Sequence, residues 1–378
     1  MKVLIIDPWG TDNTAEYLNG LIYSVSRYVD VTVYTNYGFA LESNCNCTVV
    51  RKFFKHSDNL KDGKYRKIIR GLEYIKSYMD IVRLVMINRY DVIHINWLLM
   101  YKIDKFFLRV IKLWCKNIVY TAHNVVPHLN GEKFISDLKT IYSLVDKIIV
   151  HGDCIKKEFN TYFPENMYKV FIQHHGANLR SKNTFDKSLV DGKIVSRVEG
   201  AERVYICFGK QFYNKGTDRL IKIWNESSIK SLLVVAGKIN EEYTTLKEQI
   251  KNCDNNNIVI LDYYIDDNTL SYLIDRSSVI LLPYRHASMS GVVFTAADFK
   301  KTILTTNVGS ILEYLHPGED SVVCGNNIQE IQEAIIRLET NTTNDDLALK
   351  GRKLRENIED NFSWENMGNH IVNDIYKA

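Results

Sequence analysis

The sequence predicts an α/β protein made of two doubly wound parallel-sheet domains that face each other across a cleft. Short β-branched runs alternate with segments of helical period along most of the chain, as in parallel sheets with crossover helices. The runs are almost continuously apolar, as strands buried on both faces must be. The length of 378 residues suits two domains, and a polar stretch at residues 180–202 interrupts the alternation.

In the first half, the opening apolar run ends at Asp7 and is too short for a signal peptide. No stretch approaches the roughly 18 apolar residues that a membrane span needs, so we expect a cytoplasmic protein. Strands are predicted at residues 3–7, 31–35, 92–96, 118–122, 147–151 and 170–174. Helices are predicted at residues 15–27, 102–115, 134–145 and 155–162.

In the second half, strands are predicted at residues 204–209, 232–236, 258–261, 279–283 and 302–305. Helices are predicted at residues 217–224, 241–252, 268–275, 291–299, 328–338 and 345–361, with a last helix from Trp364. We therefore divide the chain into a first domain at residues 1–185, a second at 186–360, and a crossing helix at 361–378 that packs back onto the first.

Cysteine usage and charge indicate the redox compartment of the protein and the kind of partner it binds. The seven cysteines are odd in number and show no zinc or redox spacing, which favours reduced thiols in a reducing compartment. The net charge of +3 is uneven, at +9 for residues 1–190 and −6 for residues 191–378. A basic first half favours an anionic partner surface there.

Ligands of such sheets bind beyond the carboxyl ends of the strands, so the residues that follow each strand are the candidate site. Lys210 and Lys215 follow a strand that ends at Gly209, and both are placed to reach a diphosphate. The alternative is a solvated turn with two surface lysines.

A second candidate segment, residues 283–293, also joins a strand to a helix and contains Arg285. Ser290 suits an N-cap, and Gly291 leaves room for a ligand beside the backbone N–H groups of the helix start, including Val292. The alternative is an ordinary capped helix.

His123 follows a strand of the first domain, where it can bind a sugar hydroxyl or move a proton; the alternative is a core histidine. The loop at Gly10 and Thr11 lacks the glycine fingerprint of dinucleotide-binding domains, which counts against a dehydrogenase. No Walker loop or nucleophile elbow is present. Further histidines lie near strand ends without a metal-binding spacing, namely His94, His128, His151, His174 and His175.

Taken in order, these segments resemble the GT-B glycosyltransferases, most closely glycosyltransferase family 4 and a branch of it that acts in bacterial polysaccharide assembly. The resemblance covers nearly the whole chain and implies a GT-B fold of two Rossmann-like domains. It rests on residues 91–97 (DVIHINW), 121–128 (TAHNVVPH), 208–216 (FGKQFYNKG), 290–292 (SGV), 307–309 (NVG) with Glu313, and 362–364 (FSW).

The resemblance implies a retaining transfer from a nucleotide sugar, a UDP- or GDP-sugar, without a metal or other cofactor. By position, Lys215 with Lys210 neutralises the diphosphate, and His123 contacts the donor sugar. The remaining donor-binding positions are Gly10, Thr11, Gly209, Tyr264, Arg285, Ser290, Gly291, Val292 and Glu313.

Three departures from the family pattern affect this interpretation. Ala287 and Thr295 stand where many members have two glutamates that hold sugar and ribose hydroxyls, so ribose recognition is left without its usual groups. Lys210 or Phe212 replaces an arginine, and the usual Gly and Pro before the strand at 302–305 are Lys300 and Thr302. The missing glutamates prompt one alternative, a non-catalytic nucleotide-sugar-binding partner. A second alternative is a sugar-nucleotide epimerase of the same fold, which would need carboxylates and histidines close to the donor sugar, so Ala287 and Thr295 count against it.

The acceptor side is predicted from residues 51–75, which hold eight Lys and Arg against three acids, interleaved with apolar residues. This pattern suits an anionic inner-membrane surface and, with it, a polyprenyl-diphosphate-linked saccharide or other glycan as acceptor in cell-surface polysaccharide synthesis. The alternative is a solvated basic face. No nucleic-acid recognition motif is present, so no nucleic-acid partner is expected.

Overall fold

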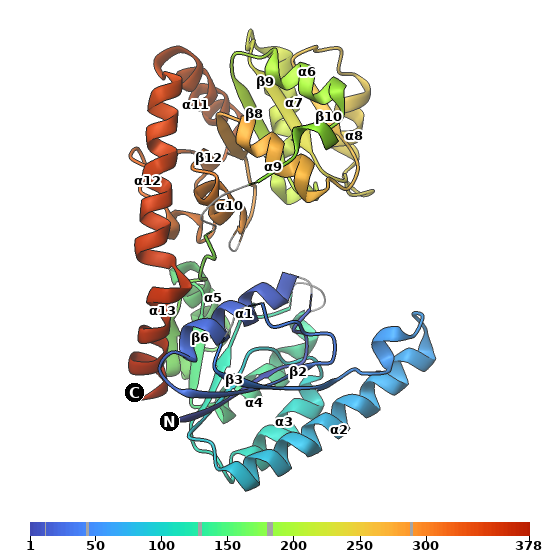
Figure 1. Ribbon diagram of the computed structural model, residues 1–378, viewed down its shortest axis with the longest axis vertical. Coiled ribbons are helices and arrows are strands. Elements are labelled where there is room, and N and C mark those ends of the chain that lie inside the picture. The colour runs from blue at the N-terminus through green and yellow to red at the C-terminus, as the bar shows by residue number, and fades with distance from the viewer. Residues whose placement is uncertain (12, 43–44, 128–130, 180–183, 288–289) are drawn as a thin grey trace. The chain divides into compact units, whose positions relative to one another are not determined.

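The computed structural model describes residues 1–11, 13–42, 45–127, 131–179, 184–287 and 290–378. They form two compact α/β units (Figure 1). Unit 1 comprises Met1–Ala177 and Phe362–Ala378, and unit 2 comprises Asn178–Asn361. The division after Ala177 falls just before the polar stretch at residues 180–202, and eight residues before the boundary chosen from sequence.

Unit 1 is built on a seven-stranded sheet whose order is β3-β2-β1-β4-β5-β6-β7. All six strand pairs are parallel, which confirms the predicted sheet type. The strand order reverses between β1 and β4, which makes this the switch point of the sheet. The strands are β1 (Lys2–Asp7), β2 (Asp30–Asn36), β3 (Cys47–Phe53), β4 (Val92–Ile95), β5 (Ile118–Thr121), β6 (Lys147–Val150) and β7 (Val170–Ile172).

Helices cover both faces of this sheet, because its central strands are buried on both sides. The helices are α1 (Asn13–Val25), α2 (Lys64–Asn88), α3 (Tyr101–Ile111), α4 (Ile135–Leu144) and α5 (Asp153–Tyr162). Short 3-10 helices are found at Ser57–Asn59 before α2, at Gly131–Phe134 before α4, and at Pro164–Lys169 after α5.

Unit 2 is built on a six-stranded, all-parallel sheet of order β10-β9-β8-β11-β12-β13, with its switch point between β8 and β11. Its strands are β8 (Val204–Phe208), β9 (Leu232–Ala236), β10 (Ile258–Leu261), β11 (Val279–Leu282), β12 (Thr302–Thr306) and β13 (Ser321–Cys324). Its helices are α6 (Gly192–Glu199), α7 (Thr217–Glu226), α8 (Thr244–Lys251), α9 (Asp267–Arg276), α10 (Val292–Asp298), α11 (Ile328–Asn341) and α12 (Asn344–Phe362), with 3-10 helices at Lys187–Leu189, Tyr213–Lys215 and Ile311–Tyr314.

The predicted strands match those of the structure except at β3 and β13, which were missed. The edge strand β3 has mostly exposed or half-buried side chains, and β13 is short, so neither shows a continuous apolar run. Helices α2 and α6 were also missed. Helix α6 buries only Ile194 and Val198, which is too few apolar positions to stand out within the polar stretch.

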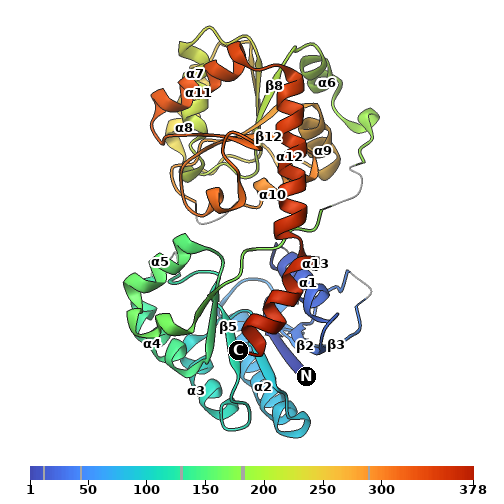
Figure 2. The same cartoon turned by 90° about the vertical axis from the view of Figure 1, so that its left-hand side faces the viewer.

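The C-terminal segment belongs to unit 1. Helix α13 (Trp364–His370) packs against α1 (Figure 2), and the π-helix Ile371–Tyr376 that follows it contacts β4 through Tyr376, whose Oη lies 2.6 Å from His94 Nδ1. Trp364 is 1% exposed, and its indole lies against Gly20 and Gly176, where any side chain would overlap the ring. These two glycines therefore leave the space that Trp364, the first residue of α13, occupies.

No described helix is long and apolar enough to cross a membrane.

Candidate functional site

The carboxyl end of the unit 1 sheet carries one polar side chain from each of five neighbouring strands. Asp7 ends β1, Asn96 follows β4, His123 lies two residues beyond β5, His151 follows β6, and Gln173 follows β7. Because parallel strands end at one edge, these residues are brought into a row that follows the strand order of the sheet.

Hydrogen bonds join this row end to end. Asn96 Nδ2 lies 2.5 Å from Asp7 Oδ2, and His123 Nε2 lies 3.0 Å from Asn96 Oδ1. His123 Nδ1 lies 3.1 Å from His151 Nε2, and His151 Nδ1 lies 2.9 Å from the carbonyl oxygen of Gln173. We call Asp7, Asn96, His123, His151 and Gln173 the strand-end chain.

Burial favours the uncharged form of each titratable group in the strand-end chain. Burial raises the pKa of Asp7 to about 6, against the opposing hydrogen bonds from Asn96, Trp9 and Gly10. Burial, with the nearby imidazole of His175, lowers the pKa of His151 to about 3, and burial lowers the pKa of His123 well below its usual value. Neutral groups of this kind suit hydroxyl recognition better than anion binding.

His123 is the centre of this chain, and its ring is held from every side. It stacks on Trp97 at a centroid distance of 4.3 Å and an angle of 6°, and it packs edge to face with Tyr17 at a centroid distance of 4.7 Å. Both ring nitrogens contact other protein groups, so a sugar hydroxyl that binds His123 must displace one of these contacts.

Sequence reasoning selected His123 but not Asp7, Asn96 or His151. The available signal was their position, since each ends or directly follows a strand. Gly10 lies nearby with φ of +49°, and its N–H donates to Asp7 Oδ1, while Thr11 accepts hydrogen bonds from Thr14 through its backbone oxygen.

Two of the other predicted histidines, His94 and His175, have hydrogen bonds to groups outside the strand-end chain. His94 lies within β4, where its ring contacts Tyr376 Oη and Thr121 Oγ1. His175 Nδ1 donates to the carbonyl oxygen of the neighbouring Gly176. His128 lies outside the described residues. Among the residues that the structure does describe, no group of three or more metal-ligating side chains could hold a metal ion.

In unit 2, Lys215 lies at the switch point of the sheet. The Tyr213–Lys215 turn follows β8, and Lys215 Nζ donates to the Phe208 carbonyl at 3.0 Å. Gly209 has φ of +89°, and a Cβ there would lie 2.8 Å from Lys215 Nζ, so glycine is required beside the ammonium group. Burial lowers the pKa of this lysine. A partly buried ammonium with donors to spare suits a phosphate oxygen.

Two arginines form hydrogen bonds at the same end of the unit 2 sheet. Arg285, which follows β11, forms a two-pronged ion pair with Asp218 of α7 at 2.7 and 2.8 Å and also donates to the Tyr213 carbonyl. Arg219 donates to the carbonyls of Pro283 and Asn326. Burial alone would lower the pKa of Arg285, but the hydrogen bonds that Arg285 donates to Asp218 and Tyr243 outweigh this effect and raise that pKa.

Arg285 therefore lies where sequence reasoning placed it, but its guanidinium is bound to Asp218. It holds the turn that carries Lys215. Asp218 and Arg219 were not selected from sequence, because residues within a helix gave no sign of facing the strand ends.

The remaining predicted donor-site residues are spread along the same edge. Ser290 is 8% exposed and shares a hydrogen bond with Tyr284 Oη, while Gly291 is exposed and α10 begins at Val292. Neighbouring Ser288 and Met289 lie outside the described residues.

Three further predicted positions lie outside that group. The side chain of Lys210 is exposed, with Nζ 5.0 Å from the centre of the Phe212 ring. Tyr264 follows β10 and is 83% exposed. Glu313 lies in the 3-10 helix after β12.

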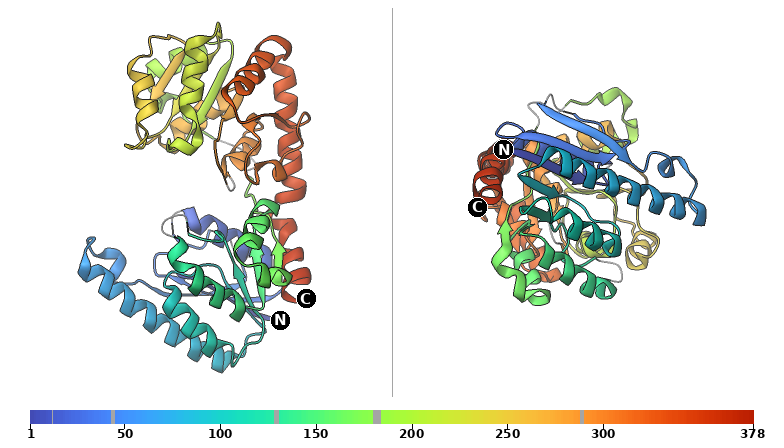
Figure 3. Two further views of the ribbon diagram at one scale, coloured as in Figure 1. Left: turned by 180° about the vertical axis from the view of Figure 1, so that it is seen from behind. Right: turned by 90° about the horizontal axis from the view of Figure 1, so that it is seen from below.

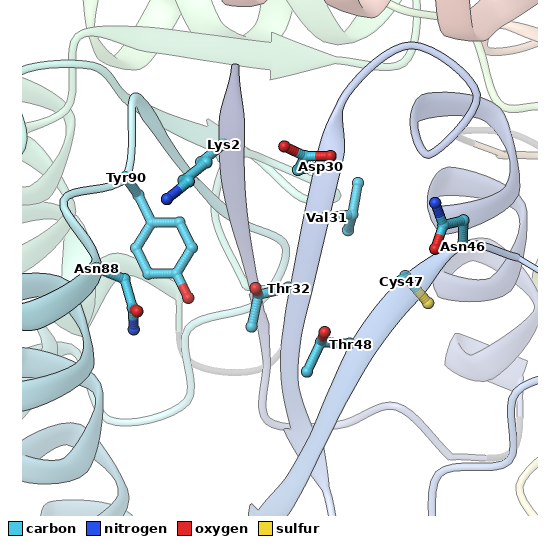
Figure 4. A pocket seen from close by; sticks show the side chains of 9 residues that line it. All are labelled: Lys2, Asp30, Val31, Thr32, Asn46, Cys47, Thr48, Asn88 and Tyr90. Atoms are coloured by element: carbon cyan, nitrogen blue, oxygen red, sulfur yellow. The ribbon is translucent and has the colours of Figure 1, made fainter.

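A hollow of about 330 Å³ lies at the opposite end of the unit 1 sheet (Figure 4). Lys2, Asp30 and Cys47, the first residues of β1, β2 and β3, contribute to its wall together with Tyr90. It is therefore separate from the strand-end chain and lies where doubly wound sheets do not usually bind ligands.

Comparisons with known proteins bear on the fold and on the class of unit 2. Residues 193–361, nearly all of unit 2, match the family model for group 1 glycosyl transferases. HepE of Anabaena in complex with UDP is 14% identical, with a TM-score of 0.70 over all of both chains. Its complex with UDP-glucose is 15% identical, with a TM-score of 0.67 over all of both chains. Sucrose-phosphate synthase of Thermosynechococcus elongatus is 13% identical, with a TM-score of 0.71 over all of this chain and 98% of that one. The GT-B fold is thus confirmed; no curated protein sequence matches the chain.

Proposed function

We propose that the protein is a glycosyltransferase that transfers a sugar from a UDP- or GDP-sugar to a hydroxyl group of a glycan or lipid-linked saccharide. The main support for this proposal is Lys215, a partly buried residue at the switch point of unit 2. It lies inside the segment that matches group 1 glycosyl transferases. The UDP and UDP-glucose complexes of a protein with the same fold support a nucleotide-sugar donor.

The charge development of the reaction explains this placement. As the sugar–phosphate bond breaks, positive charge grows on the sugar and negative charge on the diphosphate. The ammonium of Lys215 would stabilise the leaving diphosphate, and fixed charges of this kind supply much of the catalysis in many enzymes. Because a lysine can neutralise the leaving group, we propose that no metal is needed, and activity should survive EDTA.

We further propose transfer with retention on one face of the sugar. The bond from the anomeric carbon to the phosphate oxygen breaks, a bond to the acceptor oxygen forms, and the acceptor proton passes to the leaving phosphate. The anomeric configuration of the product, read by NMR, tests this step. A covalent sugar adduct on a protein side chain would contradict it.

A thermal-shift screen of UDP, GDP and other nucleotides tests the donor site. The correct nucleotide at a hundredfold excess over its Kd should add about 2.7 kcal/mol of stability. Lys215→Met should lose most of that gain, whereas Lys222→Met, on the exposed side of α7, should keep it. Equal gains in the two variants would show that the phosphate lies elsewhere.

Ala287 and Thr295 favour one alternative, a non-catalytic partner that binds a nucleotide sugar. Ala287 has no hydrogen-bonding side chain, and Thr295 offers one uncharged hydroxyl in place of a carboxylate. Donor binding without transfer or hydrolysis, across a panel of saccharide acceptors, would support this alternative.

We also propose that helix α2 places the enzyme on the inner face of the membrane, next to a polyprenyl-diphosphate-linked acceptor. Several predicted basic residues are already engaged within the protein: Arg51 with the Phe39 carbonyl, Lys52 with Asp80, and Arg66 and Arg70 with Asp58. The proposal therefore rests on a different feature, an exposed apolar stripe with heptad spacing. The stripe consists of Tyr65, Ile68, Leu72, Ile75 and Met79.

Charge favours a lipid surface over a second copy of the chain as the occupant of this stripe. Lys64, Lys76 and Arg83 are exposed beside it, so two paired copies would bring like charges together. An anionic surface would instead attract these residues, at about 1 kcal/mol for each. Figures 1 and 3 show the N-terminal end of α2 extending past the rest of unit 1.

Flotation with vesicles tests this contact. Binding should require phosphatidylglycerol and fall with the double change Ile68→Glu and Leu72→Glu. Leu349→Glu, at an exposed position of α12, is the control and should bind normally. Dimers in solution without vesicle binding would contradict the proposal.

A further inference from the structure

The loops that follow the first two strands of unit 1 carry aromatic side chains that the protein leaves exposed. Trp9 follows β1 and is 39% exposed, and Tyr37 follows β2 and is 49% exposed. Asp7 lies opposite Thr35 in the parallel register of these strands, and each aromatic residue comes two positions further along. We call Trp9 and Tyr37 the aromatic pair. It therefore lies at the same end of the sheet as the strand-end chain.

Hydrogen bonds and close packing fix the loops that carry the aromatic pair. The backbone N–H of Trp9 donates to Asp7 Oδ1 at 2.9 Å, and that of Tyr37 donates to the Phe53 carbonyl at 2.9 Å. A Cβ at Gly10 would lie 2.3 Å from a threonine hydroxyl of β2, so only glycine lets the two loops pack this closely. A ligand that binds to such fixed loops does not have to order them first.

A residue in a strained backbone conformation supports Trp9. Phe54 directly follows β3 and has φ of +59°, a left-handed conformation that bulky residues rarely adopt. Arg70 Cζ lies 3.7 Å from the centre of the Phe54 ring and 5.7 Å from the centre of the Trp9 ring. Asp58 pairs with Arg70 and also accepts a 2.9 Å hydrogen bond from Asn36 at the end of β2. Because strain of this kind gathers at functional sites, it points to a ligand beside Trp9.

The chemistry around the aromatic pair matches that of a sugar ring. A pyranose has a face of C–H groups that packs on an aromatic ring, and hydroxyl groups at its rim that need hydrogen-bond partners. Arg70 lies beside Trp9, and Lys55 Nζ lies 5.3 Å from the centre of the Tyr37 ring. Their N–H groups can donate to hydroxyl oxygens. The strand-end chain, which begins at Asp7, adds neighbouring groups that favour their uncharged forms.

Resting on the proposed function, we propose that the aromatic pair is the sugar-stacking site of the acceptor. A pyranose ring of the acceptor packs on Trp9 and Tyr37, and its rim hydroxyls accept from Arg70 and Lys55. The acceptor is then a saccharide and not a lipid alcohol alone. Arg70 belongs to α2, between two residues of its exposed apolar stripe, so the saccharide of a membrane-bound acceptor would reach the pair from that side.

A lipid surface is the main competing occupant of the aromatic pair, because tryptophan and tyrosine also gather at membrane interfaces. The structure favours a sugar over a lipid surface. A lipid surface accepts an aromatic side chain in many orientations, whereas Trp9 is held by its backbone hydrogen bond to Asp7 and by the guanidinium of Arg70.

Fluorine NMR of protein labelled with 5-fluorotryptophan tests the stacking site without any donor. The chain has five tryptophans, so Trp9 gives one of five resonances and is assigned by its loss in Trp9→Phe. Maltose, cellobiose, lactose and diacetylchitobiose are the probes, each at millimolar concentrations. At least one of them should shift the Trp9 resonance in a saturable way.

Trp114 is the matched internal control. It is 50% exposed in the same unit, but it precedes β5 and so lies toward the amino end of the sheet. Its resonance should not move with any probe. A Trp9 resonance that does not respond to any of the four sugars would overturn the proposal, as would an equal shift of Trp114.

Transfer kinetics separate the aromatic pair from the donor site. Trp9→Ala should raise the KM for a saccharide acceptor about tenfold and change the KM for the nucleotide sugar less than about twofold, because stacking is lost only on the acceptor side. Trp9→Phe should keep most of the acceptor affinity, since a phenyl ring still stacks. Trp114→Ala should match the wild type. Equal increases of both KM values in Trp9→Ala would assign the ring to the donor and overturn the proposal.

Vesicle flotation distinguishes the sugar from the lipid surface. Trp9→Ala and Tyr37→Ala should float with phosphatidylglycerol vesicles as the wild type does. Loss of flotation in both variants would assign the aromatic pair to the membrane and overturn the proposal. A saturable shift of Trp9 by a sugar, without transfer from any nucleotide sugar, would overturn the proposed function and leave a saccharide-binding site standing.

Discussion

The two sheets carry opposite chemistry at the same topological position. At the switch point of unit 1, between β1 and β4, Asp7 and Asn96 begin a buried chain whose groups favour their uncharged forms. At the switch point of unit 2, between β8 and β11, Lys215 and the Arg285–Asp218 pair provide fixed charge. One edge therefore suits hydroxyl groups and the other suits phosphate, although both sheets have the same winding. The fold sets where a ligand can bind, and the strand-end residues set which ligand it is.

The largest effect that would test this contrast is the loss of the ion pair in unit 2. Asp218→Asn leaves the Arg285 guanidinium without its carboxylate in a site where the two side chains are 18% and 9% exposed. We expect a loss of about 3–5 kcal/mol in the free energy of unfolding of unit 2, measured by hydrogen exchange of β8 and β11.

The control is Glu226→Gln on the same helix, which removes an exposed pair with Lys222 and should cost less than about 0.5 kcal/mol. Equal effects of the two changes would mean that the charged edge of unit 2 is not held rigidly.

A second effect distinguishes the uncharged edge of unit 1 by its sensitivity to acid. Burial, with the nearby imidazole of His151, lowers the pKa of His94 from 6.5 to about 3. His94 therefore contributes stability above pH 6.5 that is lost as the pH falls, by about 3 kcal/mol at pH 4. Urea unfolding followed from pH 4 to 7 should show a smaller loss in His94→Gln.

His370→Gln, at a side chain that is 44% exposed in the same unit, should unfold in acid like the wild type. If His94→Gln follows the wild type as well, the neutral histidines are not the source of the acid sensitivity.

The smallest of these effects concerns how the C-terminal segment covers unit 1. A Cβ at Gly20 would lie 2.1 Å from the Trp364 ring, so Gly20→Ala must move a buried indole. We expect a loss of about 1–3 kcal/mol, measured by hydrogen exchange in α1 and α13. Gly71→Ala in α2, where nothing lies within 4 Å, should instead stabilise unit 1 by about 0.5–1 kcal/mol. A loss at both glycines would point to a general intolerance of helix changes.

Local residue patterns were enough to predict the two parallel sheets and the positions of Lys215 and His123 after their strands. A continuous apolar run indicates a buried strand, and the residues that follow it must lie at the carboxyl end of the sheet. The same reasoning missed α2 and β3, because their apolar residues are divided between a buried and an exposed side and form no continuous run.

The partners of the site residues came only from the packed sheets. Asp7 and Asn96 are 89 residues apart, and Asn96, His123 and His151 follow at separations of 27 and 28. Arg285 pairs with Asp218, which lies 67 residues away in the sequence. This ion pair makes Arg285 a structural contact of the strand ends and not a free cation. Hydrogen-bond direction and burial depend on neighbours brought together by folding, so no local stretch of sequence records which groups share a proton or a charge.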